Sequence, residues 1–422
     1  TSPRGRRRIM QDPPIGPELL RGLTQRRLER RELIKFAGIG AGAIGLSSIL
    51  AACGVSGTSA NPTTSASTDW AAFWAEQTQT GVLNFANWPA YIDTKKGEHP
   101  TLDAFTKETG IEVNYKPVIN NNDSFYATIR PSLDQGKDTG WDLMVLSNGA
   151  QLSRLIKFGW LIPLDMAKLP TFQKYADPSV RDPNYDPDNT YTITWQSGLT
   201  GIGVNRKYIE DDITSLDQLS DPKYAGHVGM MSDNTELGSA GLLTLGIEPG
   251  TSGPSEWTLA AEKLTKQKDD GLVRNYYDQS YLNAIQNGDI WISQAWSGDI
   301  FSSQQIGYPE LEFVVPDEGA MLWHDNMMIP LHAQHPLDAI TYMDYVYRPD
   351  VAAQIADWVW YLSPVPDAKA IIANDLKDPA VAGSPLVFPD AAITAKMTNY
   401  YDFKDFQDEQ TWNDTFQPII DG

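Results

Sequence analysis

The sequence predicts an α/β fold in a chain that is large enough for two domains or lobes. From residue 82 onward, short apolar or alternating segments typical of strands are interspersed with longer segments of helical spacing. The 422 residues, of which 41% are hydrophobic, can bury a sizeable core. The sequence contains no internal repeat.

The first 52 residues have the features of an export signal. Arg30 and Arg31, followed by a mildly apolar run over residues 36–50, resemble a twin-arginine signal. This run is too short and too rich in glycine to span a membrane stably. The segment Leu-Ala-Ala-Cys-Gly at residues 50–54 resembles a bacterial lipobox, which predicts cleavage before Cys53 and a diacylglycerol on its thiol.

A flexible tether is expected after the signal. The residues between Cys53 and the first aromatic cluster are almost wholly Gly, Ser, Thr, Ala, Asn and Pro. Residues 53–68 are therefore expected to hold the body away from the membrane on a lipid anchor. Thr68 or Asp69 can then cap a short helix with three aromatic residues on one face.

In the first part of the body, proline and glycine mark the ends of several expected elements. Residues 82–88 are apolar and strand-like, and Pro89 is expected to begin a helix, because proline is favoured at the first helical position. Pro100 begins another helix, which ends at Gly110. The other elements expected here are strands over 111–115, 141–146 and 191–195, a helix that ends at Gly159, and a glycine-punctuated crossing over 198–203.

The second part of the body continues this alternation. Strands are expected over 228–231, 289–296 and 313–315, and long amphipathic helices are expected after Pro254, Pro336 and Pro349. The segment Met-Leu-Trp-His-Asp-Asn at residues 321–326 precedes an apolar run and predicts the mouth of a strand. Side chains alternate between the two faces of a strand, so Trp323 and Asp325 share one face and His324 points to the other.

The distribution of charge and the cysteine content exclude several classes of protein. Residues 1–52 carry a net charge of +6, and the remainder carries −27, for a total of −21. An acidic body would repel nucleic acid and draw small cations into a cleft. Cys53 is the sole cysteine, and the five histidines lack the spacing of metal ligands. No nucleic acid, metal or cofactor is therefore expected as a partner.

Aromatic and acidic residues occur at the ends of the predicted strands, where ligands collect in open α/β sheets. The strand-end residues are Trp88 with Tyr91, Ser147, Asp233 with Glu236, Trp296, and Trp323 with Asp325. Rings beside carboxylates suit an organic cation, since the ring offers a π face and the carboxylate a charge-assisted hydrogen bond. Two alternatives stay open at this point. The pair at 233 and 236 also fits a capping box, and the tryptophans could belong to the core.

The sequence contains no motif of an enzyme. It has no G-x-S-x-G segment, no Walker A loop and no metalloprotease helix. The protein is therefore expected not to be an enzyme. Asp233 and Glu236 leave one weaker alternative, the carboxylate pair of an extracellular hydrolase.

Seven segments carry a resemblance to a known family. They are residues 84–91 (NFANWPAY), 106–113 (TKETGIEV), 141–143 (WDL), 201–205 (GIGVN), 289–296 (DIWISQAW), 323–330 (WHDNMMIP) and 347–352 (YRPDVA). Over nearly the whole of residues 81–390, the chain resembles the periplasmic spermidine/putrescine-binding proteins, which are solute receptors of polyamine ABC importers. The resemblance implies a type II periplasmic-binding-protein fold with a ligand cleft between two hinged lobes. Lobe 1 would comprise residues 69–198 and 324–369, and lobe 2 residues 199–323 and 370–422.

The resemblance also implies a set of ligand-binding residues. The family's aromatic box would be Trp88, Tyr91, Trp296, Trp323 and Tyr361, its amine-binding carboxylates Asp233, Glu236 and Asp325, and a polar contact Ser147. Only Tyr361 is added to the strand-end residues. The family's amide contact near the C-terminus has no clear match in residues 398–402.

The resemblance implies a non-enzymatic receptor outside the cytoplasm, anchored to the cell membrane through the lipid on Cys53. Its partners would be a polyamine, spermidine or putrescine, and an ABC permease in the membrane, and it would act as a monomer. Two alternatives keep the fold and change the ligand. One is another organic cation. The other is ferric iron, since the tyrosine pairs at 276–277 and 400–401 could supply paired phenolates.

Overall fold

The computed structural model describes residues 68–403 and 406–422. The predicted export segment, the lipidation site Cys53 and the tether up to residue 67 lie outside the described residues. Helix α2 (Trp70–Glu76) forms where a capped helix was predicted, and Oδ1 of Asp69 accepts a hydrogen bond from the backbone N–H of Ala72 at 3.0 Å. The described residues 68–75 belong to one unit, and Glu76–Gly422 belong to a second, compact unit that contains the other elements.

The strands confirm the predicted α/β class. They are β1 (Val82–Asn87), β2 (Glu112–Pro117), β3 (Leu143–Ser147), β4 (Thr192–Asn205), β5 (Val228–Met231), β6 (Val273–Tyr277), β7 (Ile292–Trp296), β8 (Leu311–Val314), β9 (Ala320–Met328) and β10 (Met397–Asn399). They form a single sheet in the order β2-β1-β3-β9-β4-β7-β5-β6, with β10 beside β9 and β8 beside β4.

The helices alternate with these strands along the chain. After α2 they are α3 (Pro100–Thr109), α4 (Asn122–Asp134), α5 (Ala150–Lys157), α6 (Pro170–Tyr175), α7 (Asn234–Leu243), α8 (Pro254–Asp269), α9 (Tyr281–Asn287), α10 (Ser297–Ile306), α11 (Pro336–Tyr345), α12 (Pro349–Val359), α13 (Ala368–Ile371), α14 (Pro379–Gly383), α15 (Ala391–Thr394) and α16 (Phe406–Asp421). The predicted starts at Pro100, Pro254, Pro336 and Pro349 are confirmed. No helix within the described ranges is both long and apolar enough to cross a membrane.

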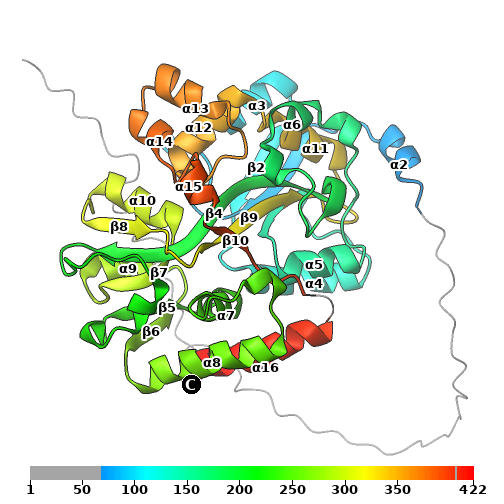
Figure 1. The fold of residues 1–422 in the computed structure, drawn as a ribbon. Coiled ribbons are helices and arrows are strands. Elements are labelled where there is room, and N and C mark those ends of the chain that lie inside the picture. Colours follow the sequence, from blue (N-terminus) through cyan, green and yellow to red (C-terminus); the bar gives the residue numbers. More distant parts are fainter. Residues whose placement is uncertain (1–67, 404–405) are drawn as a thin grey trace, which may run out of the picture. The chain divides into compact units, whose positions relative to one another are not determined.

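The sheet has two parallel parts joined by two central antiparallel strands. Strands β1, β2 and β3 are parallel to one another, and so are β5, β6 and β7. Between them, β9 is antiparallel to β3, β4 is antiparallel to β9, and β7 is antiparallel to β4. Figure 1 shows β4 and β9 side by side across the middle of the unit, with α3, α11 and α12 near one part and α7, α8 and α16 near the other.

Pro89 does not begin a helix, so that prediction is wrong. The chain turns here, and α3 begins only at Pro100. The side chain of Asn87 accepts a hydrogen bond from the backbone N–H of Trp88 at 2.8 Å, and Ala90 has a φ of 55°. Proline at the second position of a turn fits the same φ as proline at the start of a helix, so the residue alone does not separate the two.

The predicted strand over 191–195 is confirmed by β4, which begins at Thr192. The expected glycine crossing at 198–203 is part of the same long strand, in which every residue is buried. Its pairing with β9 shifts register between Thr194 and Gln196, which places a bulge at Trp195. Asp325 lies within β9 rather than at the mouth of a strand, because β9 continues to Met328 as a partner of both neighbours.

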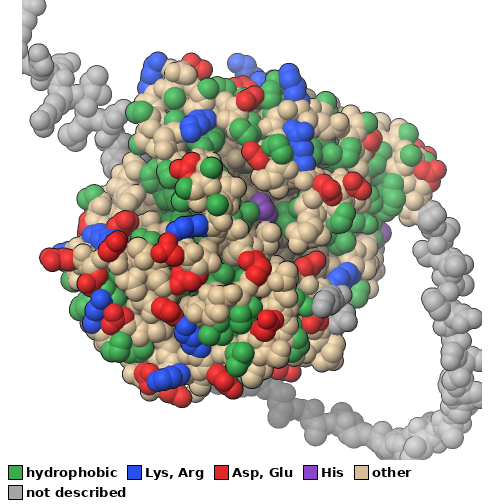
Figure 2. Space-filling model, viewed as in Figure 1, with side chains coloured by type: hydrophobic (Ala, Val, Ile, Leu, Met, Phe, Trp, Pro, Cys, Tyr) green, Lys and Arg blue, Asp and Glu red, His purple; other side chains and the backbone are tan. Residues whose placement is uncertain are grey.

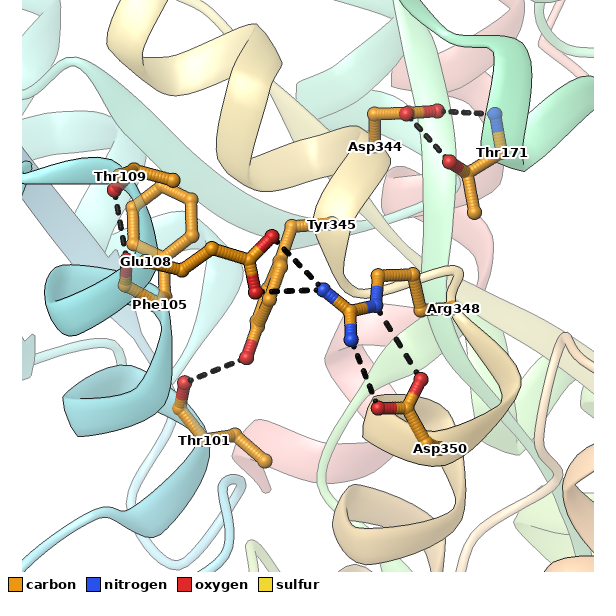
Figure 3. Close-up of polar contacts among 9 residues, drawn as sticks. All are labelled: Thr101, Phe105, Glu108, Thr109, Thr171, Asp344, Tyr345, Arg348 and Asp350. Carbon is orange, nitrogen blue, oxygen red and sulfur yellow. Dashed lines mark hydrogen bonds and ion pairs between the residues drawn. The ribbon is translucent and has the colours of Figure 1, made fainter.

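An exposed arginine network ties the helices beside β1 and β2 together (Figure 3). Arg348, which precedes α12, donates to both carboxylate oxygens of Glu108 on α3, at 2.8 and 3.0 Å, and also pairs with Asp350. Nearby, the carboxylate of Asp344 accepts hydrogen bonds from the hydroxyl and backbone N–H of Thr171 and joins α11 to α6. The side chain of Glu108 is 57% exposed, so this pair contributes at most about 1 kcal/mol to stability.

Candidate functional site

Asp325 is the centre of the candidate site. The antiparallel register of β3 and β9 places it opposite Ser147, whose hydroxyl donates to Oδ1 at 2.6 Å. The hydroxyl of Tyr91 donates to Oδ2 at 2.7 Å. Asp325 is 5% exposed, and burial raises the pKa of its carboxyl to about 6, although both hydroxyls favour the charged form. Three predicted site residues are therefore brought together.

The bulge in β4 helps to position Tyr91. Bulges re-aim side chains next to binding sites. The side chain of Trp195, at the bulge, donates from Nε1 to the backbone oxygen of Tyr91 at 3.2 Å. Its ring lies edge-on to the Tyr91 ring, with centroids 6.4 Å apart. Trp195 thus orients the phenol that reaches Asp325.

Three aromatic rings lie together beside Asp325. The Tyr361 ring is 5.5 Å from the Tyr91 ring and 5.4 Å from the Trp323 ring, measured between centroids. Glycines make room for them: a Cβ on Gly198 would lie 2.2 Å from the Trp323 ring, and one on Gly298 would lie 2.4 Å from the Tyr361 ring. The glycines in β4 and α10 therefore allow the rings to lie directly on the backbone.

Asp299 is a further buried carboxylate at this site that the sequence reasoning did not select. Its Oδ1 accepts from the hydroxyl of Tyr361 at 2.9 Å, and its Oδ2 accepts from the hydroxyl of Tyr281 at 3.1 Å. Burial raises the pKa of this carboxyl to about 6. The sequence did contain a signal for Asp299, because it lies three residues after Trp296. The first turn of α10 places it near the strand end that carries Trp296.

Glu236 forms a second centre at the start of α7. Its Oε1 accepts from the hydroxyl of Thr200 at 2.8 Å and from Nε1 of Trp296 at 3.2 Å. Its Oε2 is buried and accepts no hydrogen bond of ordinary geometry from the described residues, although the Tyr400 hydroxyl lies near enough to favour the charged form. Burial, together with the charge of Asp233, raises the pKa of Glu236 to about 7.

Asp233 caps helix α7, and Glu236 does not complete a capping box. Oδ1 of Asp233 accepts from the backbone N–H groups of Thr235 and Glu236, at 2.8 and 3.1 Å. Glu236 instead turns toward β4 and β7, as the contacts of its Oε1 show. Asp233 itself is exposed, so its second oxygen can reach a ligand while the first holds the helix.

The two centres lie along one face of β4. Gly198 faces Trp323, and Thr200, two residues further on, contacts Glu236. Two residues of strand span about 7 Å. Tyr281 also links the centres, since its hydroxyl donates to Asp299 and accepts from the backbone N–H of Trp296 at 3.0 Å.

The carboxylates of the site lack basic partners. None of the ion pairs formed by residues 68–403 and 406–422 includes Glu236, Asp299 or Asp325. A buried carboxylate without a cation is costly, because burial removes its hydration. The arrangement therefore suits a ligand that supplies positive charge between aromatic rings.

A comparison with known protein families shows which family this chain belongs to. Residues 101–388 match the family of bacterial extracellular solute-binding proteins. The chain belongs to this family. It is also 31% identical over 323 residues to the spermidine/putrescine-binding periplasmic protein of Salmonella typhimurium, a match that covers 76% of this chain and 87% of that protein. The putrescine-binding periplasmic protein of Escherichia coli is 29% identical over 335 residues, covering 75% and 85% of the two chains.

Solved structures show the same fold. A spermidine/putrescine ABC transporter substrate-binding protein from Streptococcus pneumoniae superposes with a TM-score of 0.68 at 24% identity, covering 81% of this chain and 98% of that chain. A lipoprotein from Treponema pallidum gives a TM-score of 0.67 at 20% identity, covering 80% and 99%. This solute-binding protein therefore has the predicted type II periplasmic-binding-protein fold.

Trp88 is the predicted site residue whose contacts lie mainly in the core of the solute-binding protein. Its Nε1 donates to the backbone oxygen of Val145 at 3.1 Å. Its ring packs against the apolar cluster formed by α4, β3 and α5 and remains partly exposed.

His324 does not share the neighbours of Asp325, as the alternation of side chains along a strand predicts. Its Nδ1 lies 2.6 Å from the hydroxyl oxygen of Ser197, and burial lowers the pKa of its imidazole to about 4.

The two tyrosine pairs of this solute-binding protein do not share a centre. Tyr276 packs against the core beside α7 and α8, and burial raises its pKa to about 12, opposite to what a phenolate ligand requires. Tyr400 faces Glu236, whereas the hydroxyl of Tyr401 donates to Asp408 at 2.7 Å. In the part of the chain that the structure describes, no group of three His, Cys, Asp or Glu side chains is arranged to hold a metal ion.

The solute-binding protein also has a surface groove apart from this site. It lies between β8 and α10 on one side and α14 and α15 on the other, and Phe301, Phe313, Pro379 and Ile393 are among the residues that line it. None of the candidate site residues lines this groove. By contrast, Figure 2 shows a hollow near the middle of the same view, in the region where β4 and β9 lie side by side in Figure 1.

Proposed function

We propose that this protein is an extracytoplasmic receptor that binds a polyamine and delivers it to an ABC importer. One observation carries the proposal: Glu236, Asp299 and Asp325 are buried, lack ion pairs with described residues, and lie among aromatic rings. The names of the relatives in Salmonella typhimurium and Escherichia coli support spermidine or putrescine as the ligand.

The chemistry of a polyamine matches this arrangement. Each ammonium group can donate charge-assisted hydrogen bonds to a carboxylate, worth about 1.5–3 kcal/mol each. Each cation–π contact with a ring adds about 0.5–2 kcal/mol. Oε2 of Glu236, which is buried and has no hydrogen-bond donor of ordinary geometry among the described residues, would accept one ammonium, and Asp325 and Asp299 would accept another. The rings of Trp323, Tyr361 and their neighbours would enclose the methylene chain.

The proposed site consists of the predicted residues together with Asp299. Trp88, Tyr91, Ser147, Asp233, Glu236, Trp296, Trp323, Asp325 and Tyr361 would contact the ligand, Trp88 only through the exposed part of its ring. Lobe 1 (residues 69–198 and 324–369) and lobe 2 (residues 199–323 and 370–422) would close over it by a hinge motion. The central strands β4 and β9 would carry this hinge, since they link the two parallel parts of the sheet.

The remaining parts of the proposal concern the setting of the receptor. We propose that Cys53 carries the lipid anchor, that residues 1–52 direct export, and that the protein acts as a monomer beside an ABC permease. The site would bind and release its ligand without catalysis. The charge of the body supports a cationic ligand, because a net charge of −27 attracts cations toward a cleft.

A thermal-shift panel tests the proposed ligand class. Putrescine, spermidine, spermine, choline, amino acids, sugars and ferric citrate would each be added to the full chain. A ligand at 100 times its dissociation constant stabilises the folded state by about 2.7 kcal/mol, which raises the melting temperature clearly. Polyamines are expected to give the largest shifts. A shift with choline but none with any polyamine would replace the proposed ligand with another organic cation.

A further inference from the structure

Helix α5 is tied to helix α16 by a largely buried ion pair. Nη2 of Arg154 on α5 donates to Oε1 of Glu409 on α16 at 2.5 Å, and the two side chains are 26% and 8% exposed. The guanidinium also lies over the Tyr126 ring, 5.9 Å from its centroid. Nearby, Nζ of Lys157 donates to the backbone oxygen of Phe403 at 2.8 Å. Helix α5 therefore contacts α16 through Arg154 and the segment before α16 through Lys157.

The two helices belong to different parts of the unit. Helix α5 follows β3 directly, in the part of the sheet that contains β1 and β2. Helix α16 packs against α7 and α8, which accompany β5 and β6. The central strands β4 and β9 link the two parts that would move in a hinge closure. The contact of Arg154 with Glu409 is a further link between them.

Each helix is also coupled to one centre of the candidate site. Helix α5 begins just after Ser147, the residue that donates to Asp325. On the other side, Nε1 of Trp412 on α16 donates to the backbone oxygen of Asn234, at the start of α7, at 3.2 Å. A Cβ on Gly238 of α7 would lie 2.4 Å from the Trp412 ring, so the two helices are in close contact. Glu236 is carried by the same first turn of α7.

We infer that the ion pair of Arg154 with Glu409 is a latch between the two parts of the unit. It holds the Asp325 centre and the Glu236 centre at a fixed separation. Arg154 and Glu409 are positioning residues, since the contacts that define the latch are with each other and not with the site carboxylates. The inference rests on the proposed function for its effect on ligand affinity. A receptor that binds only in its closed form loses apparent affinity in proportion to the closed fraction, so breaking the latch weakens binding without touching the ligand.

The first test is calorimetry with spermidine on the full chain. Glu409→Gln keeps the shape of the side chain and removes its charge. We expect it to raise the dissociation constant about fivefold or more, because a smaller fraction of the receptor is then closed. Glu108→Gln is the matched control, because it breaks the Arg348 pair in Figure 3, which joins helices α3 and α12 on one side of the sheet. This control is expected to stay within about twofold of the wild type.

A double-mutant cycle separates the pair from effects of either side chain alone. If the latch acts through the pair, adding Arg154→Gln to Glu409→Gln costs much less than Arg154→Gln costs by itself. Additive effects of the two substitutions would show that the pair is not the coupling element. Equal affinities for the wild type and Glu409→Gln would overturn the inference.

A distance measurement tests the latch independently of the ligand. Spin labels would be placed at the exposed positions Lys137 and Asp414 by cysteine substitution in a Cys53→Ala background. Without ligand, Glu409→Gln is expected to lose part of the short-distance population of the parent protein. If spermidine fails to bind the wild type, the proposed function fails, and this distance alone decides on the latch. Identical distance distributions in the two proteins would contradict it.

Discussion

The hydroxyl group of Tyr91 lies 2.7 Å from Oδ2 of Asp325, although 234 positions separate the two residues in the chain. Ser147 donates to the other oxygen, so both oxygens of this buried carboxylate are met by neutral hydroxyls. Hydroxyl donors offset only part of the cost of burying a charge, and the pKa stays near 6. A cation bound here, as proposed, would supply the positive charge that the neutral hydroxyls of Tyr91 and Ser147 do not.

Replacing Asp325 removes this charge. Asp325→Asn is expected to weaken spermidine or putrescine binding at least about tenfold, because an ammonium then loses a charge-assisted hydrogen bond. Isothermal titration calorimetry at pH 8 measures the change. Asp344→Asn serves as a control for removing a carboxylate elsewhere, since Asp344 contacts Thr171 and Phe172 rather than the site. Affinity unchanged in Asp325→Asn would remove Asp325 from the site.

Tyr91→Phe tests the hydrogen bond rather than the carboxylate. The hydroxyl of Tyr91 lowers the pKa of Asp325, so its loss raises that pKa further. We expect weaker polyamine binding at pH 6 and a smaller deficit at pH 8, where Asp325 is charged in both proteins. Calorimetry at the two pH values checks this. A deficit that does not depend on pH would show that the hydroxyl does not act through Asp325.

Polyamine affinity is expected to rise with pH. Burial places the pKa of Asp299 and Asp325 at about 6 and that of Glu236 at about 7, and a cation binds the charged forms. Dissociation constants measured between pH 5 and 8 should therefore fall as pH increases. Glu236→Gln should flatten the part of this dependence nearest pH 7. Affinity that is constant across the range would contradict the raised pKa values.

The stability of the ligand-free protein should depend on pH in the opposite direction. Between about pH 4 and 7 the folded chain keeps protons on these carboxyls that the unfolded chain has released, so stability from these groups falls as pH rises. Thermal melts of the wild type and of Asp325→Asn isolate the contribution of the Asp325 carboxyl to this pH dependence. The wild type should lose more stability than the variant between pH 5 and 7. An equal loss would indicate that Asp325 is not held at a raised pKa.

Gly198 should tolerate no side chain. An added Cβ would lie 2.2 Å from the Trp323 ring, so Gly198→Ala must displace that ring. We expect a loss of about 1–3 kcal/mol in the free energy of unfolding, together with weaker ligand binding. Gly383→Ala is the control, since nothing lies within 4 Å of its Cβ position, and it should change stability by less than about 0.5 kcal/mol. Denaturant unfolding of both variants distinguishes them.

Two substitutions should separate the structural role of Asp233 from its role in ligand binding. Asp233→Asn keeps a good helix cap on α7, whereas Asp233→Ala loses about 1 kcal/mol of stability. Both variants should bind polyamine more weakly if the second oxygen of Asp233, which does not cap the helix, contacts the ligand. Normal binding by Asp233→Asn would leave Asp233 with the cap alone.

Local sequence predicted most of the elements that position the site. Proline at the first turn and glycine after the last turn marked α3, and proline marked α8, α11 and α12. These signals act within a few residues of the element. Pro89 failed as a helix signal because a turn uses the same proline geometry, and the side chain of Asn87 favours the turn.

The contacts across the sheet required the structure. The bulge at Trp195 depends on the register between β4 and β9, which the spacing of residues in either strand does not reveal. Asp299 was visible as an acid after Trp296, but only the packing of Tyr281 and Tyr361 shows its burial. Tyr400 reaches Glu236 because β10 pairs with β9, a contact between distant segments.

The most direct test of the central claim is calorimetric titration of the full chain with spermidine and with putrescine at pH 8. The account predicts saturable binding of at least one of them, weakened at least about tenfold by both Glu236→Gln and Asp325→Asn. Absence of binding by the wild type, or binding that neither substitution weakens, would contradict it.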